Sequence, residues 1–172
     1  MKNLSVPYRQ QLDNADNPYG SCNVTSLAMC LLYFKIPQKY PDKQFEDELY
    51  EYADNNGLDR HEPLDLKKIA EAYGAIDDYT LIGSLADARH AIDCGFPCIV
   101  HGYFTKSGHI IVLRGYDDTG FFVNDPYGEW FPEHYNTDNS GENLHYSNEL
   151  ISNACADADK AASMWLHRIK LK

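Results

Sequence analysis

Apolar residues in the first half of the chain recur every three or four positions, which is the spacing of a helix with a buried face. This pattern predicts helices over residues 22–34, 42–56, 64–73 and 84–95. Ser21, Asp42 and Ser84 are candidate N-caps, and Gly57 and Gly74 are placed to end two of the helices. Because apolar residues dominate the first helix, we expect it to be mostly buried.

Beyond Pro97 the pattern changes to segments rich in β-branched and aromatic residues with turn residues between them. The predicted strands are residues 98–104, 110–116 and 121–124, with a closing strand at 164–171. The stretch 126–141 mixes turn residues with aromatic ones, which predicts a packed surface loop, and a short helix is expected near Ser147. Helices followed by strands indicate an α+β fold, with the first helix packed on a C-terminal antiparallel sheet.

The chain has 172 residues, so we expect residues 1–172 to form a single domain. It carries 26 acidic against 15 basic residues, and this excess of negative charge argues against a nucleic-acid partner. The N-terminus lacks the apolar run of a signal peptide, and no segment has the length of a membrane-spanning helix. We therefore expect a cytoplasmic protein without a membrane span.

The five cysteines form no CxxC pair, so the sequence suggests neither a disulfide framework nor a zinc site. One of them, Cys22, lies at the predicted first turn of a helix, behind a glycine-containing loop. Unpaired N–H groups and the helix dipole at this position favour an anion, and therefore the reactive thiolate. Cys22 is a candidate nucleophile, although a small buried residue at a helix start would give the same local pattern.

A candidate base, His109, opens the apolar strand before the predicted hairpin turn. If Tyr116 lies opposite Gly120 in this hairpin, Ile111 faces Asp125, and His109 is a diagonal neighbour of Asp125 on the same face. A slip of one residue would place the two side chains on opposite faces. With the first register, the hairpin predicts a hydrogen bond between His109 and Asp125.

Thiol catalysis needs a base near the thiol and an acceptor that fixes the tautomer of that base. Cys22, His109 and Asp125 would supply these groups and form a thioacyl intermediate with an amide substrate. A donor to the developing oxyanion should lie near the thiol, and Gln10 and Gln11 lie a short loop upstream. The alternative is an ordinary amphipathic hairpin that happens to end in His and Asp.

Aromatic residues flank the candidate groups: Tyr19 precedes the thiol, and Trp130 follows Asp125. They are candidates for the wall of a substrate groove or, equally, for a packed loop core. His101 lies on the strand before His109, but it lacks the spacing of a metal-ligand set. We therefore expect no metal and no cofactor.

Three parts of the sequence resemble the bacteriocin-processing-type cysteine peptidases of the papain-like superfamily. They are VPYRQQLDN at 6–14, SCNVTSLAM at 21–29, and GHIIV at 108–112 leading to VNDPYG at 123–128. The resemblance implies a papain-like fold and assigns the roles of nucleophile, base, orienting acid and oxyanion donor to Cys22, His109, Asp125 and Gln11. Many family members have Gly after the catalytic Cys, where this chain has Asn23.

The resemblance also implies a peptide or protein substrate. It fits two settings, the processing of a polypeptide and the cleavage of peptide cross-links in bacterial cell wall, as by a phage lysin. Two alternatives stay open. One is a papain-like acyltransferase that passes the acyl group to an amine or thiol, and the other is a catalytically silent binding or inhibitor protein that uses the aromatic loop.

Overall fold

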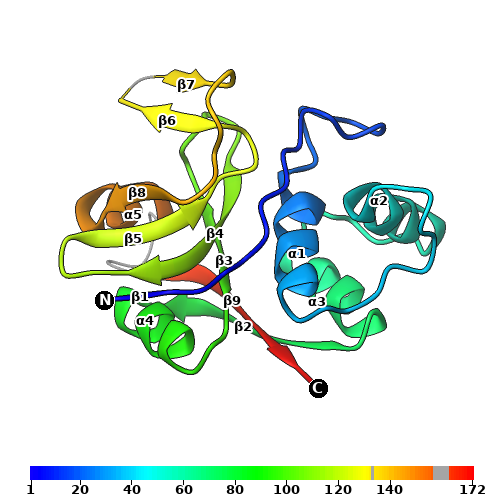
Figure 1. The fold of residues 1–172 in the computed structure, drawn as a ribbon, viewed down its shortest axis with the longest axis horizontal. Coiled ribbons are helices and arrows are strands. Elements are labelled where there is room, and N and C mark those ends of the chain that lie inside the picture. The colour runs from blue at the N-terminus through cyan, green and yellow to red at the C-terminus, as the bar shows by residue number, and fades with distance from the viewer. Residues whose placement is uncertain (133, 157–162) are drawn as a thin grey trace.

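The computed structural model describes residues 1–132, 134–156 and 163–172. Helices α1 (Cys22–Tyr33), α2 (Phe45–Asn55) and α3 (Pro63–Ala72) gather on one side of the molecule (Figure 1). The strands lie on the other side, together with α4 (Leu85–Asp93) and α5 (Asn148–Cys155). This arrangement confirms the predicted α+β class. None of the described helices is long and apolar enough to cross a bilayer.

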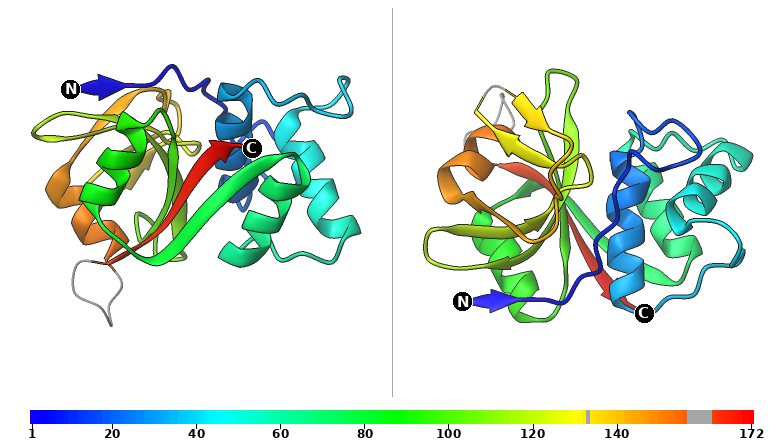
Figure 2. Two further views of the ribbon diagram at one scale, coloured as in Figure 1. Left: turned by 90° about the horizontal axis from the view of Figure 1, so that it is seen from below. Right: turned by 45° about the horizontal axis from the view of Figure 1, so that its top comes forward.

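Among the described residues, seven strands form one antiparallel sheet, in which β2, β9, β3, β4, β5 and β8 are neighbours in that order and β1 pairs with β4. Their bounds are β1 (Lys2–Asn3), β2 (Ala75–Gly83), β3 (Cys98–Gly102), β4 (His109–Tyr116), β5 (Gly120–Asn124), β8 (Leu144–Ser147) and β9 (Met164–Leu171). A second sheet is the hairpin of β6 (Glu129–Phe131) and β7 (His134–Asn136). The strand predicted at the C-terminus is confirmed as β9, which lies inside the sheet between β2 and β3 (Figure 2).

The sequence pattern does not reveal β2, β8 or the β6–β7 hairpin. In β2 the consecutive acids Asp77 and Asp78 hide the strand alternation, because Asp77 is buried despite its charge. The prediction of a packed surface loop over 126–141 misses the hairpin in it, because β6 and β7 pair there. Residue 133 of this stretch lies outside the described residues. Short strands with polar residues carry too weak a period to be read from sequence.

The helix ends follow the predicted caps with two exceptions, at the starts of α1 and α2. Ser84 and Asp87 form the expected capping arrangement, in which the Ser84 hydroxyl accepts from the Asp87 N–H at 3.2 Å and Asp87 accepts from the Ser84 N–H at 2.9 Å. Ser147 caps α5, as the short helix predicted there requires. For α2 the N-cap is Gln44 and not Asp42, so this helix starts later than predicted.

The β4–β5 hairpin changes register along its length. Near the turn Tyr116 pairs with Phe121, one residue away from the predicted partner. A bulge at Arg114 absorbs the extra residue of β4, and beyond it the strands adopt the predicted register. The open end of the hairpin therefore brings His109 and Asp125 together as predicted, although the turn end is wrong by one residue.

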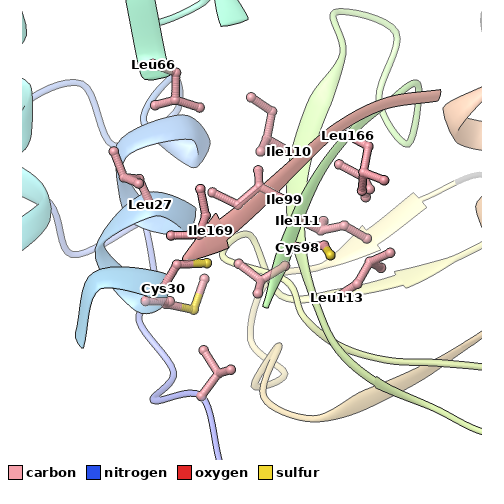
Figure 3. Close-up of a cluster of buried hydrophobic side chains, with 14 of the residues drawn as sticks. Leu27, Cys30, Leu66, Cys98, Ile99, Ile110, Ile111, Leu113, Leu166 and Ile169 are labelled. Carbon is pink, nitrogen blue, oxygen red and sulfur yellow. The ribbon is translucent and has the colours of Figure 1, made fainter. Parts of the chain in front are cut away.

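Helix α1 lies at the centre of the core, as its predicted burial requires. Its residues from Asn23 to Leu31 are all buried. Figure 3 shows Leu27 and Cys30 of α1 in one cluster with Leu66 of α3 and Ile169 of β9. Full burial of each large aliphatic side chain stabilises the fold by about 1.5–3 kcal/mol, so this packing fixes α1 firmly against the sheet.

Three polar side chains form a buried chain across β2, β9 and β3. Asp77 Oδ2 lies 2.6 Å from His167 Nδ1, and His167 Nε2 lies 2.9 Å from His101 Nε2. Burial, together with the neighbouring His167, lowers the pKa of His101 to about 3, so His101 is neutral at ordinary pH. His101 is therefore part of a structural hydrogen-bonded chain and not an isolated strand histidine.

Candidate active site

Cys22 is the first residue of α1, whose N-terminal end lies at the same end of the molecule as the β6–β7 hairpin (Figure 1). Its thiol is free and partly exposed, whereas Cys30, Cys98 and Cys155 are buried. The first N–H groups of a helix have no acceptor within it, so the positive end of the α1 dipole is directed at the Cys22 region. The structure thus places an accessible thiol where an anion is favoured.

The loop before α1 is fixed by bonds to its carbonyl groups. Ser21 is the N-cap by position, but its hydroxyl donates to the carbonyls of Asp16 and Asn17, at 3.0 and 2.8 Å, and does not cap the helix. Arg60 donates from Nη1 to the carbonyl of Gly20 at 3.2 Å. The predicted side-chain cap is therefore wrong, because the Ser21 hydroxyl is used to hold the preceding loop.

His109, the first residue of β4, lies between Asp125 and Cys22. Its Nε2 is 2.7 Å from Asp125 Oδ1, and the Cys22 thiol lies near enough to the ring to influence its pKa. His109 is 5% exposed and Asp125 is 0% exposed. Burial by itself would lower the pKa of His109, but Asp125 and Cys22 outweigh burial and raise that pKa to about 10. The imidazole is thus held in its charged form at neutral pH.

Asp125 follows β5, and its carboxylate is fully occupied by donors. Oδ1 faces His109 and also accepts from the backbone N–H of Tyr127 at 3.0 Å. Oδ2 accepts from the hydroxyls of Tyr135, at 2.9 Å, and Tyr146, at 3.0 Å. The sequence makes Tyr135 a candidate for the groove wall together with Trp130, but it does not indicate that Tyr135 or Tyr146 contacts Asp125.

Aromatic rings surround His109 and explain its burial. The ring centroids of Phe104, Tyr127 and Tyr135 lie 6.3, 6.0 and 5.5 Å from that of His109. Tyr127 and Tyr135 also pack edge to face on each other, with centroids 5.0 Å apart. A ring that is shielded in this way meets little water, so its interaction with Asp125 is stronger than it would be at the surface.

Tyr127 and Tyr135 lie in the segment 126–141, whose two ends are joined through the Asp125 backbone. The Asp125 N–H donates to the carbonyl of Gly141 at 2.9 Å. A Cβ atom on Gly141 would lie 1.8 Å from the Asp125 carbonyl oxygen, so the two backbones can approach only because Gly141 has no side chain. The segment 126–141 therefore starts directly after Asp125, and its last residue, Gly141, is hydrogen-bonded to Asp125.

Gln11, the predicted oxyanion donor, lies between the segment after Asp125 and the loop before Cys22. It is buried, its N–H donates to the carbonyl of Pro126 at 2.9 Å, and its Nε2 donates to the carbonyl of Pro18 at 2.8 Å. Within the described residues its Oε1 has no hydrogen-bond partner. The amide carries a second N–H, so the bond to Pro18 leaves one donor for another acceptor.

The two predicted groove residues are placed differently. Tyr19 is 79% exposed in the loop before Cys22. Trp130 is partly buried on β6, and its Nε1 donates to the carbonyl of Phe104 at 3.0 Å. Trp130 also lines a pocket of about 690 Å³ between the hairpin, β8 and α5. A role in substrate binding stays a prediction for both residues.

Asn23 follows the candidate nucleophile, and its side chain is buried in the protein. It is fully buried, and its Oδ1 accepts from the Val24 N–H at 2.8 Å. The side chain is thus accommodated inside the first turn of α1. Over the described ranges, no three His, Cys, Asp or Glu side chains are arranged to hold a metal ion. The chemistry that the described groups can support is nucleophilic catalysis by a thiol beside a charged imidazole.

Comparison with known proteins bears on this arrangement. The sequence profile of the Peptidase_C39 like family matches residues 3–152. No curated protein sequence matches the chain. A solved C39-like peptidase from Bacillus anthracis is 20% identical, with 99% of this chain and 98% of that chain covered and a TM-score of 0.63.

Two further solved structures have the same fold. One is a double glycine motif protease from an AMS/PCAT transporter in complex with the leader peptide, at 20% identity, 99% and 95% coverage of this and that chain, and a TM-score of 0.58. The other is the peptidase domain of Streptococcus ComA, a bi-functional ABC transporter of a quorum-sensing pathway, at 16% identity, 97% and 99% coverage, and a TM-score of 0.58. At these identities the likeness establishes the fold, and it confirms the papain-like fold expected from the sequence.

Proposed function

Because the chain belongs to the Peptidase_C39 like family and is a cysteine peptidase, we propose that it cleaves peptide bonds with Cys22 as nucleophile, His109 as base and Asp125 as orienting acid. The observation that carries this assignment is the buried His109 ring, held between the two other groups with its pKa raised to about 10. A raised imidazole pKa lets the proton of Cys22 reside on His109, so the sulfur can attack as a thiolate.

The reaction proceeds in two acyl-transfer steps. The Cys22 thiolate attacks the carbonyl carbon of the scissile bond, and the tetrahedral intermediate collapses as His109 gives its proton to the leaving amine. The neutral His109 then takes a proton from water, and the resulting hydroxide attacks the thioester. The acid product leaves, the Cys22 thiolate is restored, and His109 is again charged. Asp125 holds Nε2 throughout, which leaves Nδ1 as the ring nitrogen that exchanges the proton in this account.

The oxyanion of each tetrahedral intermediate is stabilised by the Cys22 backbone N–H and the Gln11 side chain in this account. The positive end of the α1 dipole adds to this stabilisation. The bond from Gln11 to Pro18 supports the assignment, because it fixes the amide against the loop that leads into Cys22. The second N–H of the amide is the group that would reach the oxyanion.

A polypeptide is the substrate class that we favour over cell-wall peptide. The double glycine motif protease with this fold was solved with a leader peptide bound, which supports an extended peptide as the ligand of such a site. Tyr19 is exposed beside the nucleophile loop and offers an aromatic contact to a peptide chain. The experiment described next also tests the two alternatives, which are cleavage of cell-wall peptide as by a phage lysin and acyl transfer to an amine.

Incubation of the protein with a degenerate peptide library and, separately, with purified peptidoglycan tests the proposal. We expect linear peptides to be cut, with one heavy oxygen atom in the new carboxylate when the reaction runs in heavy-oxygen water. Prior alkylation of the protein with iodoacetamide should abolish the cuts. Mass spectrometry of the products identifies ligation to an added amine as acyl transfer, and cleavage of peptidoglycan alone as lysin activity. A complete lack of cleavage in both substrates contradicts the proposal.

A further inference from the structure

The Asp125 carboxylate is held from the side that faces away from His109. Oδ2 accepts the hydroxyls of Tyr135 and Tyr146, at 2.9 and 3.0 Å, while Oδ1 lies 2.7 Å from His109 Nε2. We propose that Tyr135 and Tyr146 are positioning residues, which fix the Asp125 carboxylate so that Oδ1 stays on His109 during catalysis. This inference rests on the proposed function and assigns further residues to the same site.

The two hydroxyls come from different elements and meet at one oxygen. Tyr135 lies on β7 of the hairpin, and Tyr146 lies on β8 of the main sheet. A carboxylate held through one oxygen alone can rotate about its Cβ–Cγ bond, whereas donors on both oxygens define its plane. The phenols hold Oδ2 and the Tyr127 N–H holds Oδ1, and together they set the direction that Asp125 presents to His109.

Both phenols remain donors at every accessible pH. Burial, followed by the negative charge of Asp125, raises the pKa of Tyr135 and of Tyr146 well above the ordinary tyrosine value. Neither hydroxyl therefore ionises next to the carboxylate, and each can only donate to it. Hydrogen bonds from a neutral donor to a buried charge are stronger than those between neutral groups.

The same contacts tie the β6–β7 hairpin to the site. The Tyr146 hydroxyl also accepts from the backbone N–H of Trp130 on β6, at 3.0 Å, so it links β6 to Asp125. Tyr135 links β7 to the same carboxylate, and Gly141 closes the base of the segment 126–141 on the Asp125 backbone. The position of the hairpin and the orientation of the Asp125 carboxylate thus depend on the same hydrogen bonds.

Removal of single hydroxyls tests the inference. For Tyr135→Phe and Tyr146→Phe we expect kcat to fall about 10- to 100-fold with KM unchanged, the loss typical of a hydrogen bond to a charged group. The matched control is Tyr116→Phe, which removes a hydroxyl that donates to an Asp93 carboxylate oxygen at 2.8 Å, far from the site on the exposed end of β4. The control should keep the kcat and KM of the wild type.

Two readouts separate positioning from a general structural role. In an Asp125→Asn background, Tyr135→Phe should cause no further fall in kcat, because the tyrosine acts only through the carboxylate. In the Tyr135→Phe/Tyr146→Phe protein, nuclear magnetic resonance titration of the His109 ring should show a pKa below the wild-type value of about 10, since Asp125 is the main group that raises it.

The inference is overturned if both single variants keep the wild-type kcat, or if their losses add fully to that of Asp125→Asn. If Tyr146→Phe does not fold, Tyr135→Phe decides alone, because Tyr135 lies on the partly exposed hairpin. If the wild type cleaves no peptide, the proposed function fails, and the His109 titration still decides the positioning role. An unchanged titration in the double variant would overturn that role independently.

Discussion

Replacement of Cys22 by Ala is expected to reduce peptide cleavage by about 10⁴-fold or more, the size of effect seen when one member of a catalytic triad is removed. The thiol forms the bond to the acyl group in the proposed reaction, so no neighbouring group can replace it. The fold should persist, because Cys22 is partly exposed and makes only a small contribution to the core. Initial rates on a cleaved library peptide, with circular dichroism of the purified variant, check both statements.

Cys94→Ala is the matched control for this loss. Cys94 is a free and exposed thiol, and its Sγ lies 4.0 Å from His90 Nε2, so it also has a histidine beside it. It lies at the C-terminal end of α4 and not at a helix N-terminus. Its removal should leave cleavage unchanged. Equal losses in the two variants would contradict the assignment of Cys22 as the nucleophile.

His167→Leu is expected to lower the free energy of unfolding by about 3–5 kcal/mol, because it removes the hydrogen-bond donor to a fully buried carboxyl group. His167 and Asp77 are 0% and 1% exposed, and Asp77 Oδ1 already has no hydrogen-bond partner among the described residues. Loss of His167 would leave the whole carboxylate without its donor in the core. Urea unfolding followed by circular dichroism measures the change.

Two comparison variants show whether the cost comes from leaving the buried Asp77 carboxyl group without its partner. His145→Leu removes a histidine that pairs with Asp117 at 3.2 Å, but this pair is 37% and 31% exposed, so the expected loss is about 0–1 kcal/mol. Asp77→Leu/His167→Leu should be more stable than His167→Leu alone, because no buried carboxylate remains. A double variant that is less stable than the single one would refute this explanation.

The candidate triad could be predicted because each member occupies a position that local sequence defines. Cys22 begins an apolar helix, and His109 and Asp125 belong to one hairpin whose alternation can be followed residue by residue. The prediction nevertheless used the wrong pairing at the turn, and the bulge at Arg114 restores the correct one. No sequence pattern predicts a bulge of this kind, because it depends on how β4 pairs with the neighbouring strands.

The buried polar contacts could not be predicted, since they depend on contacts between distant segments. The Tyr146 bond to Asp125 spans 21 residues, and the His167 bond to Asp77 spans 90. In each case a buried polar residue looks like a surface residue until its partner is known. For this reason the acidic residue Asp77 prevented the prediction of β2, and the hydrogen bond of His101 to His167 could not be predicted from the sequence.

The central claim, that His109 activates Cys22, is tested most directly by the rate of Cys22 alkylation with iodoacetamide at about pH 6, well below the ordinary thiol range. Peptide mass spectrometry follows each cysteine, and exposed Cys94 is the internal reference. We compare the wild type with His109→Gln, which keeps an amide donor for Asp125 but cannot hold the proton. The account predicts that Cys22 reacts much faster than Cys94 in the wild type and loses this advantage in the variant. A Cys22 that reacts no faster than Cys94, or equally fast without His109, would contradict it.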